Sequence, residues 1–236
     1  MSRLEIKRVS AGYGRNDVVA AITLDIPESS VVALVGPNGH GKTTLLRAIS
    51  GLVRVTSGSI VLQGSDITNL RPDRIAQMGM AHVPQGDLLF PLMNVRENLL
   101  MGAFGERSAQ VVADRLEMVF GLFPKLVSLQ AQTANSLSGG ERRMVGLGRG
   151  LMAGAPVMLI DEPSLGLAPI VIDQVYGAIQ AMKSRDISVL LVEENPERAA
   201  SIADHIYLLD NGSIAWSGRP RELLGSKTIL KTYLGM

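Results

Sequence analysis

VGPNGHGKTT, residues 35–44, carries the spacing G-x-x-x-x-G-K-T between Gly36 and Thr43. Glycines in this order let the backbone fold tightly enough for several N–H groups to point at phosphate oxygens. Lys42 would then reach the outer phosphates, and the Thr43 hydroxyl can ligate Mg²⁺. A helix that begins at Lys42 would add its positive N-terminal end. The stretch therefore predicts a phosphate-binding loop.

The segments around this loop predict an α/β fold. VVALV (31–35) is a continuous apolar run, which predicts a parallel strand buried on both faces, and residues 42–50 predict a helix after it. LEIKRVS (4–10) and AAITLDIP (20–27) alternate apolar and polar residues, as strands of an antiparallel layer with one exposed face do. SGSIVLQG (57–64) returns to short strand character.

The last third of the chain has the same α/β character. VMLI (157–160) and SVLLV (188–192) predict two more buried strands, with a helix at about 169–183 between them. IYLLDNGSIAWSG (206–218) predicts two strands joined by a tight Asn-Gly turn.

The middle third is predicted to be helical. Apolar residues recur at three- and four-residue spacings in QVVADRLEMVFGLF (110–123), and a second helix is expected from Ser138 to about Met152. We predict one nucleotide-binding core, about 1–86 plus 154–236, with a helical insertion of about 87–153.

Composition narrows the class of protein. The 236 residues are 46% hydrophobic and 19% charged, as in a globular chain. A net charge of +1 gives no reason to expect nucleic acid as the main partner. The absence of cysteine excludes disulfides and thiolate chemistry. No apolar run approaches a membrane span, and we expect no signal peptide. A mean hydropathy of +0.22 indicates either a large core or extensive apolar contact with partner subunits.

Two further motifs carry chemistry. Asp161 and Glu162 follow a buried strand, where the first acid can hold Mg²⁺ and the second can deprotonate an attacking water. In NSLSGGERR, Ser138 and Glu141 form a capping-box pattern, and two glycines bare the backbone at that helix start. A chain with one phosphate loop does not need a second anion site for itself. Two chains packed head to tail do need one, because the Ser138 region of each chain would close the phosphate loop of the other.

Together these motifs resemble the nucleotide-binding subunit of an ATP-binding cassette (ABC) transporter. GPNGHGKTT resembles its Walker A loop, LSGGE its signature and VMLIDEP its Walker B motif. The resemblance implies a RecA-like P-loop NTPase core with an N-terminal antiparallel β layer and an inserted helical signature subdomain. It also implies that Gln85 in HVPQG touches Mg²⁺ and senses a membrane partner, and that Tyr13 in AGYG stacks on adenine.

Finer features resemble the F-type ATP-binding subunit of branched-chain amino acid importers, namely DEPSLGLAP, LLVEEN, FPLMNVRENLLMGAF and YLGM. That group implies two ATPase chains on the cytoplasmic face of the inner membrane, peripheral to two transmembrane permease subunits. A periplasmic substrate-binding protein feeds the permeases. The second ATPase chain would be another copy or a G-type paralogue. Residues 90–99 would meet a cytoplasmic helix of a membrane subunit, unless Phe90, Leu92 and Met93 pack in the core.

The expected reaction is hydrolysis of Mg²⁺-ATP between two head-to-tail chains. The expected catalytic residues are Glu162, Lys42 and Gln85, and the expected metal ligands are Thr43, Gln85 and Asp161. The expected nucleotide contacts are Tyr13, Gly36, Pro37, Asn38, Gly39, His40, Gly41, Lys42, Thr43, Thr44, Ser138, Gly139, Gly140, Glu141 and Glu194.

The chain departs from the family pattern at the switch histidine after the strand that follows Walker B. That position is Glu194, or Glu193 if the alignment slips by one. A carboxylate near the γ-phosphate would repel it unless it is protonated or turned away. Relatives usually have alanine or serine at His40, so this side chain either points off the phosphate or adds pH-dependent charge there.

Other readings remain open. A small-molecule kinase or a GTPase would lack LSGGE, and a soluble ABC protein usually has coiled-coil insertions or fused cassettes. An exporter of lipid or polysaccharide, or an importer of urea or amides, shares the main motifs. The transported molecule is not encoded in this chain.

Overall fold

The computed structural model describes residues 2–14, 16–86 and 88–234. The strands are β1 (Ser2–Tyr13), β2 (Asn16–Pro27), β3 (Val31–Val35), β4 (Val55–Leu62), β5 (Ser65–Asp66), β6 (Met80–Val83), β7 (Val157–Asp161), β8 (Ser188–Glu193), β9 (His205–Asp210) and β10 (Ser213–Gly218). The α-helices are α1 (Lys42–Ile49), α2 (Pro72–Gln77), α3 (Val95–Leu100), α4 (Ala109–Leu122), α5 (Lys125–Leu129), α6 (Gly139–Met152), α7 (Pro169–Met182), α8 (Pro196–Ile202), α9 (Pro220–Gly225) and α10 (Lys227–Leu234).

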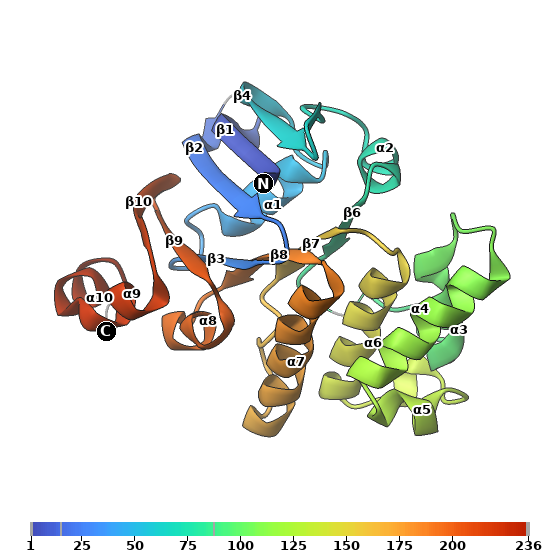
Figure 1. The fold of residues 1–236 in the computed structure, drawn as a ribbon. Helices are drawn as coiled ribbons and strands as arrows, with labels where there is room; N and C mark the ends of the chain where they lie inside the picture. The colour runs from blue at the N-terminus through green and yellow to red at the C-terminus, as the bar shows by residue number, and fades with distance from the viewer. Residues whose placement is uncertain (1, 15, 87, 235–236) are drawn as a thin grey trace.

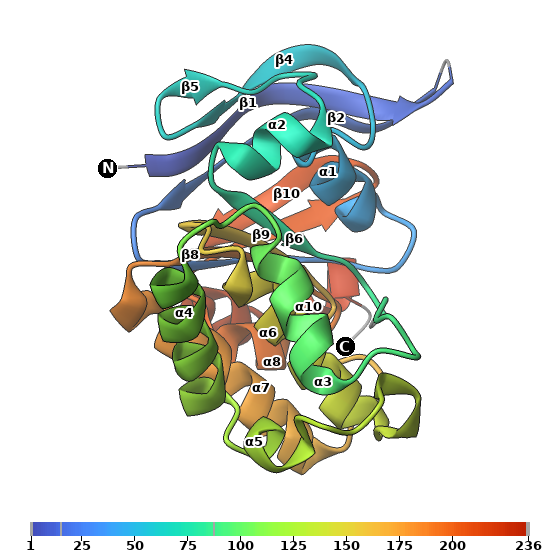
Figure 2. The ribbon, with the colours of Figure 1, turned by 90° about the vertical axis from the view of Figure 1, so that its right-hand side faces the viewer.

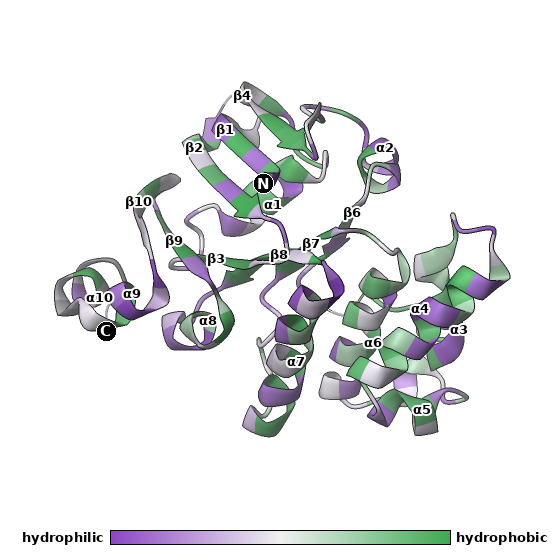
Figure 3. Ribbon diagram, viewed as in Figure 1, coloured by the Kyte–Doolittle hydropathy of each residue, from purple (hydrophilic) through white to green (hydrophobic). Residues whose placement is uncertain are grey.

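A central sheet with strand order β10-β9-β3-β8-β7-β6 crosses the middle of the molecule (Figure 1). The neighbours β9-β3-β8-β7-β6 are parallel, and β10 pairs antiparallel with β9. Along β7, Val157 and Leu159 face one hydrophobic cluster while Met158 and Ile160 face the cluster on the opposite side. Both faces are covered, so β3 and the inner residues of β7 and β8 are apolar, and β3 appears green in Figure 3.

A second, antiparallel sheet has the order β2-β1-β4-β5 and lies above the central sheet in Figure 1. Helix α1 is sandwiched between the two sheets, where Leu45, Leu46 and Ile49 are fully buried in one cluster with Ile6 and Leu24. Because α1 begins at Lys42, directly after the glycine-rich loop, this packing fixes the loop against the central sheet.

The opposite face of the central sheet is covered by α6 and α7, with α3, α4 and α5 gathered beyond α6 (Figure 2). The segment before α3 is organised by Asn98, which is completely buried. Its side chain accepts a hydrogen bond from the Phe90 N–H at 2.8 Å and donates to the carbonyls of Phe90 and Met93. Core packing was an open alternative for Leu92, and it is wrong, because 83% of Leu92 is exposed.

The predicted strands and long helices are confirmed, with β1 and β2 each longer than predicted. Outside the middle third the sequence analysis missed α10, and it also missed α2, α8 and α9, which are short and have proline at the first helical position. Proline there is itself a start signal that would have found them. The helical insertion at about 87–153 coincides with α3 to α6, and its status as a separate unit stays a prediction. Within the described ranges, no helix combines the length and apolar content that a bilayer crossing requires.

Candidate active site

Three adjacent strands of the central sheet deliver the predicted functional segments to one edge. The glycine-rich loop follows β3, the acids Asp161 and Glu162 close β7, and Glu193 closes β8. Because β8 lies between β3 and β7 and all three are parallel, their carboxyl ends meet there. Ligands of open α/β sheets bind in such a position.

The loop after β3 wraps tightly around its own lysine. Gly39 and Gly41 have positive φ angles of 83° and 105°, which the glycines adopt without strain. The buried Lys42 ammonium donates to the carbonyls of Gly36 at 2.8 Å and Pro37 at 3.1 Å, and lies 3.7 Å from Glu162 Oε1. The cation is therefore held between the loop and the acid that follows β7.

The space in front of this lysine is a cavity of about 370 Å³. It is lined by Asn38, Gly39, Gly41, Lys42, Thr43, Thr44, Gln85, Glu162 and Leu165. All of these except Leu165 were named from the sequence as contacts or catalytic groups. Leu165 was missed because a lone leucine in a loop carries no chemical signal, although it follows the Asp-Glu-Pro motif by two residues.

Asp161 has the properties of a cation ligand. The residue is 1% exposed, and neither carboxylate oxygen has a hydrogen-bond partner among the described residues, although Thr43 lies nearby. Burial raises the pKa of Asp161, and the nearby Thr43 hydroxyl and the cations Lys42 and Arg47 offset part of this effect. A buried carboxylate without a partner beside a hydroxyl fits a hard divalent cation such as Mg²⁺.

Glu162 is placed to act as a base. It is 6% exposed and has a left-handed backbone with φ 45°, which a non-glycine residue adopts at a cost on the order of 1–3 kcal/mol. Gln85 donates from Nε2 to its Oε2 at 2.9 Å. Burial raises the pKa of Glu162, Lys42 opposes the rise, and nearby carboxylates add to it. A carboxyl group with a raised pKa is a better proton acceptor than one in water.

The two candidates for the switch position differ in exposure. Glu193 is 3% exposed and hydrogen-bonded inside the chain, whereas the Glu194 side chain is exposed. Both line a second cavity of about 360 Å³ that also includes Glu162 and Leu165. Of the two, Glu194 is therefore the one whose side chain is exposed beside the cavity.

The signature segment forms the predicted capping box. Ser138 accepts from the Glu141 N–H at 3.4 Å, and the Ser138 N–H donates to the Glu141 carboxylate at 2.8 Å. Lys125, bonded to Glu141 at 2.9 Å, is the main cause of its lowered pKa. Gly140 is packed so closely that a Cβ would meet Val171 of α7 at 2.7 Å. Ser138, Gly139 and Gly140 do not line the cavity around the loop, so one chain does not bring the two motifs together.

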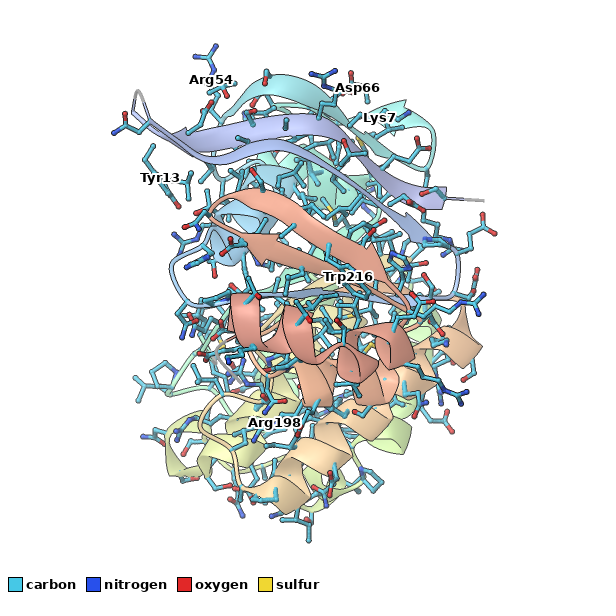
Figure 4. All side chains as sticks on the ribbon, turned by 90° about the vertical axis from the view of Figure 1, so that its left-hand side faces the viewer. Lys7, Tyr13, Arg54, Asp66, Arg198 and Trp216 are labelled. Carbon is cyan, nitrogen blue, oxygen red and sulfur yellow. The ribbon has the colours of Figure 1, made fainter. Side chains whose placement is uncertain are left out.

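The predicted nucleotide contacts Tyr13 and His40 also lie outside the cavity lining, as do Gly36, Pro37, Glu141 and Glu194. Tyr13 is 51% exposed at the end of β1, at the rim of the antiparallel sheet (Figure 4), and its hydroxyl accepts from Arg47 at 3.2 Å. His40 turns toward the β9–β10 turn. There its Nδ1 lies 3.0 Å from Asp210 Oδ1 and 3.0 Å from the Asn211 N–H donor. The His40 side chain is therefore directed away from the cavity.

Comparison with known proteins agrees with this geometry. The ABC transporter family pattern matches residues 19–165. The branched-chain amino acid transport ATP-binding protein BraG of Pseudomonas aeruginosa is 37% identical, covering 98% of this chain and 99% of its own. A probable branched-chain amino acid transport protein, LivF of Archaeoglobus fulgidus, is also 37% identical, with 99% of each chain covered.

More distant relatives include a protein of an export system as well as a cassette of known structure. LptB of Haemophilus influenzae, an ATP-binding protein of a lipopolysaccharide export system, is 31% identical over 100% of this chain and 98% of its own. A nucleotide-free ATP-binding cassette from an ABC transporter superposes with a TM-score of 0.86 at 25% identity, covering 98% of both chains. This chain belongs to the ABC transporter family and is an ATP hydrolase with a P-loop NTPase fold.

Proposed function

We propose that this chain is the Mg²⁺-ATP-hydrolysing subunit of a membrane importer for branched-chain or other hydrophobic amino acids. Its similarity to BraG and LivF over nearly the full length of all three chains supports this assignment. The transported amino acid never touches the chain. ATP hydrolysis supplies the conformational work.

The observation that supports the hydrolytic role best is the position of Glu162 between Lys42 and Gln85. The carboxylate would take a proton from the attacking water, which Gln85 would help to orient. Lys42 and the loop amides would stabilise charge on the transferring phosphoryl group. Thr43, Asp161 and Gln85 would hold Mg²⁺, which neutralises phosphate charge when bound.

A second ATPase chain would complete each site. Ser138 and Gly139 are exposed at the N-terminus of α6, a fourteen-residue helix whose positive end faces outward. Facing the glycine-rich loop of a partner chain, this end would close over the γ-phosphate. The partner is a second copy or a G-type paralogue.

The surface near Gln85 suits a membrane subunit. A cleft of about 440 Å³ there includes the exposed side chains of Leu88, Phe90 and Met101 in its lining. Arg149 of α6 holds this region, donating to the Leu88 carbonyl at 2.9 Å and lying 5.7 Å from the Phe90 ring centroid. We infer that a cytoplasmic helix of each of two permease subunits docks in such a cleft, so that the chain sits peripherally on the inner membrane.

The test is uptake of radiolabelled leucine by cells in which the gene is deleted and then restored as wild type or as Glu162→Gln. The proposal predicts that the deletion abolishes high-affinity uptake, that wild type restores it and that Glu162→Gln does not. Unchanged leucine uptake combined with lost urea uptake would favour an amide importer. A defect in outer-membrane lipopolysaccharide would favour the exporter role indicated by the LptB similarity.

A further inference from the structure

The buried carboxylate of Glu193 accepts hydrogen bonds from several elements and has no part in the reaction described above. Glu193 is the last residue of β8, is 3% exposed and accepts four hydrogen bonds. Its Oε1 accepts from the main-chain N–H groups of Glu194 at 3.0 Å and Asn195 at 3.3 Å. Its Oε2 accepts from the hydroxyls of Ser164, at 2.8 Å, and Tyr176. Every donor comes from a different residue, so the carboxylate joins them.

These donors belong to separate elements around the active site. Ser164 lies two residues after the base Glu162, in the loop that leads into α7, and Tyr176 is on α7 itself. Ser164 also accepts from Arg198 of α8 at 3.1 Å, and the N–H of Arg198 is capped by the Asn195 side chain at 2.9 Å. Arg198 is labelled in Figure 4. These hydrogen bonds therefore connect the segment Glu194–Asn195 after β8 with the loop at Ser164 after β7.

Packing alone does not account for an acid at this position. The other residues of β8 are apolar except Ser188, and an apolar residue would extend the strand without desolvating a charge. Burying a carboxylate destabilises the fold unless hydrogen-bond donors surround it. Even with donors, a buried charged group seldom stabilises the fold more than an apolar residue of similar size. Here the donors are complete. Burial and the neighbouring Glu193 raise the pKa of Tyr176, so its hydroxyl remains a donor throughout the working pH range.

We propose that Glu193 is a positioning residue, which holds the switch segment Glu194–Asn195 and the loop at Ser164 as one rigid unit beside Glu162. In this arrangement the orientation of the switch residue over the phosphate site cannot change without moving the loop after Walker B. The inference rests on the ATPase activity of the chain and is independent of the transported molecule. ATP turnover tests it, whereas leucine uptake tests the proposed function.

The decisive variant is Glu193→Gln, which keeps the volume and one acceptor oxygen but puts an NH₂ group among the hydroxyl donors. The matched control is Glu197→Gln, an exposed glutamate on α8 in the same region. ATP turnover at saturating Mg²⁺-ATP, dissociation constants for ATP and thermal unfolding are measured for each. We expect Glu193→Gln to lower kcat about ten-fold with ATP affinity within about two-fold of wild type, and Glu197→Gln to change neither.

A merely structural role would lower the unfolding midpoint and leave kcat per folded molecule unchanged, and that result would overturn the proposal. A double-mutant cycle provides the second test. Tyr176→Phe removes one donor, keeps the buried ring and should lower kcat about three-fold in the wild-type background. In the Glu193→Gln background it should have no further effect, because the hydroxyl acts through the carboxylate. Multiplicative losses would contradict the positioning role.

Discussion

Gln85 and Glu162, which lie 77 residues apart in the chain, are joined by a hydrogen bond of 2.9 Å from Nε2 to Oε2. The bond links the end of β6, at the edge of the central sheet, to the acid that follows β7. Gln85 also precedes the apolar cleft at Leu88 and Phe90. A partner that moves the segment around Gln85 would therefore shift Glu162 through this hydrogen bond.

Removing the amide of Gln85 should weaken catalysis without weakening the fold. Gln85 is exposed, so Gln85→Ala should leave the unfolding midpoint within about 1 °C of wild type while kcat falls roughly ten-fold. Gln110→Ala on α4, which also removes an exposed glutamine, is the matched control and should leave kcat unchanged. Equal turnover in both variants would show that the bond to Glu162 has no role in hydrolysis.

Replacing the base should separate binding from chemistry. Glu162→Gln keeps the shape of the side chain and can still bond to Gln85, but it cannot take a proton. We expect kcat to fall at least about 100-fold, as for other general bases, while ATP still binds. Phosphate release gives the first quantity and equilibrium nucleotide titration the second. Retention of more than about a tenth of wild-type turnover would assign the proton to another group.

The pH profile should respond to Glu194. Glu162 must be ionised to act as a base, and its raised pKa places the acid limb of kcat/KM above the ordinary value of 4.5. The negative charge of Glu194 contributes to that rise, so Glu194→Gln should lower the pKa of Glu162 and move the limb to lower pH. Turnover measured from acid to neutral pH checks this. A limb that moves upward would exclude the assignment.

The buried His82 should make the fold sensitive to acid. Burial, with the Arg47 charge as a smaller cause, lowers the pKa of His82 from 6.5 to about 4. The unfolded chain therefore binds a proton between these values that the folded chain does not. His82 therefore does not reduce the free energy of unfolding above pH 6.5, but it lowers that free energy by up to roughly 3 kcal/mol as the pH falls toward 4. Urea titrations at several pH values give the free energy of unfolding as a function of pH. His82→Gln should flatten this dependence between pH 6.5 and 4, and the control His205→Gln should leave it as in wild type. The same dependence in all three proteins would contradict this role of His82.

The sequence was sufficient for the parts of the site whose chemistry is local. The loop at Lys42 and the acids Asp161 and Glu162 each follow a recognisable strand, so motif and context could be checked together. It was not sufficient where a role depends on tertiary contacts. Glu193 looks like any strand-end glutamate until Ser164 and Tyr176, 29 and 17 residues away, are seen to converge on it.

The signature motif shows a different limit. The capping box at Ser138 is a local feature and was predicted from its spacing, whereas its proposed target is the loop of another chain. A single chain cannot display that contact. Tyr13 is similar in that it lies exposed at the rim, beside Arg47 and outside the cavity lining.

The central claim is that the site is built from Lys42 of one chain and Ser138 of the other, and mixing two inactive variants tests it most directly. Lys42→Ala removes the phosphate-binding cation, and Ser138→Arg blocks the signature face. Both homodimers should be inactive, but random pairing gives half heterodimers with one intact site of two, so the mixture should regain about a quarter of wild-type ATP turnover. A mixture no more active than its two components would contradict a site shared between two copies of this chain.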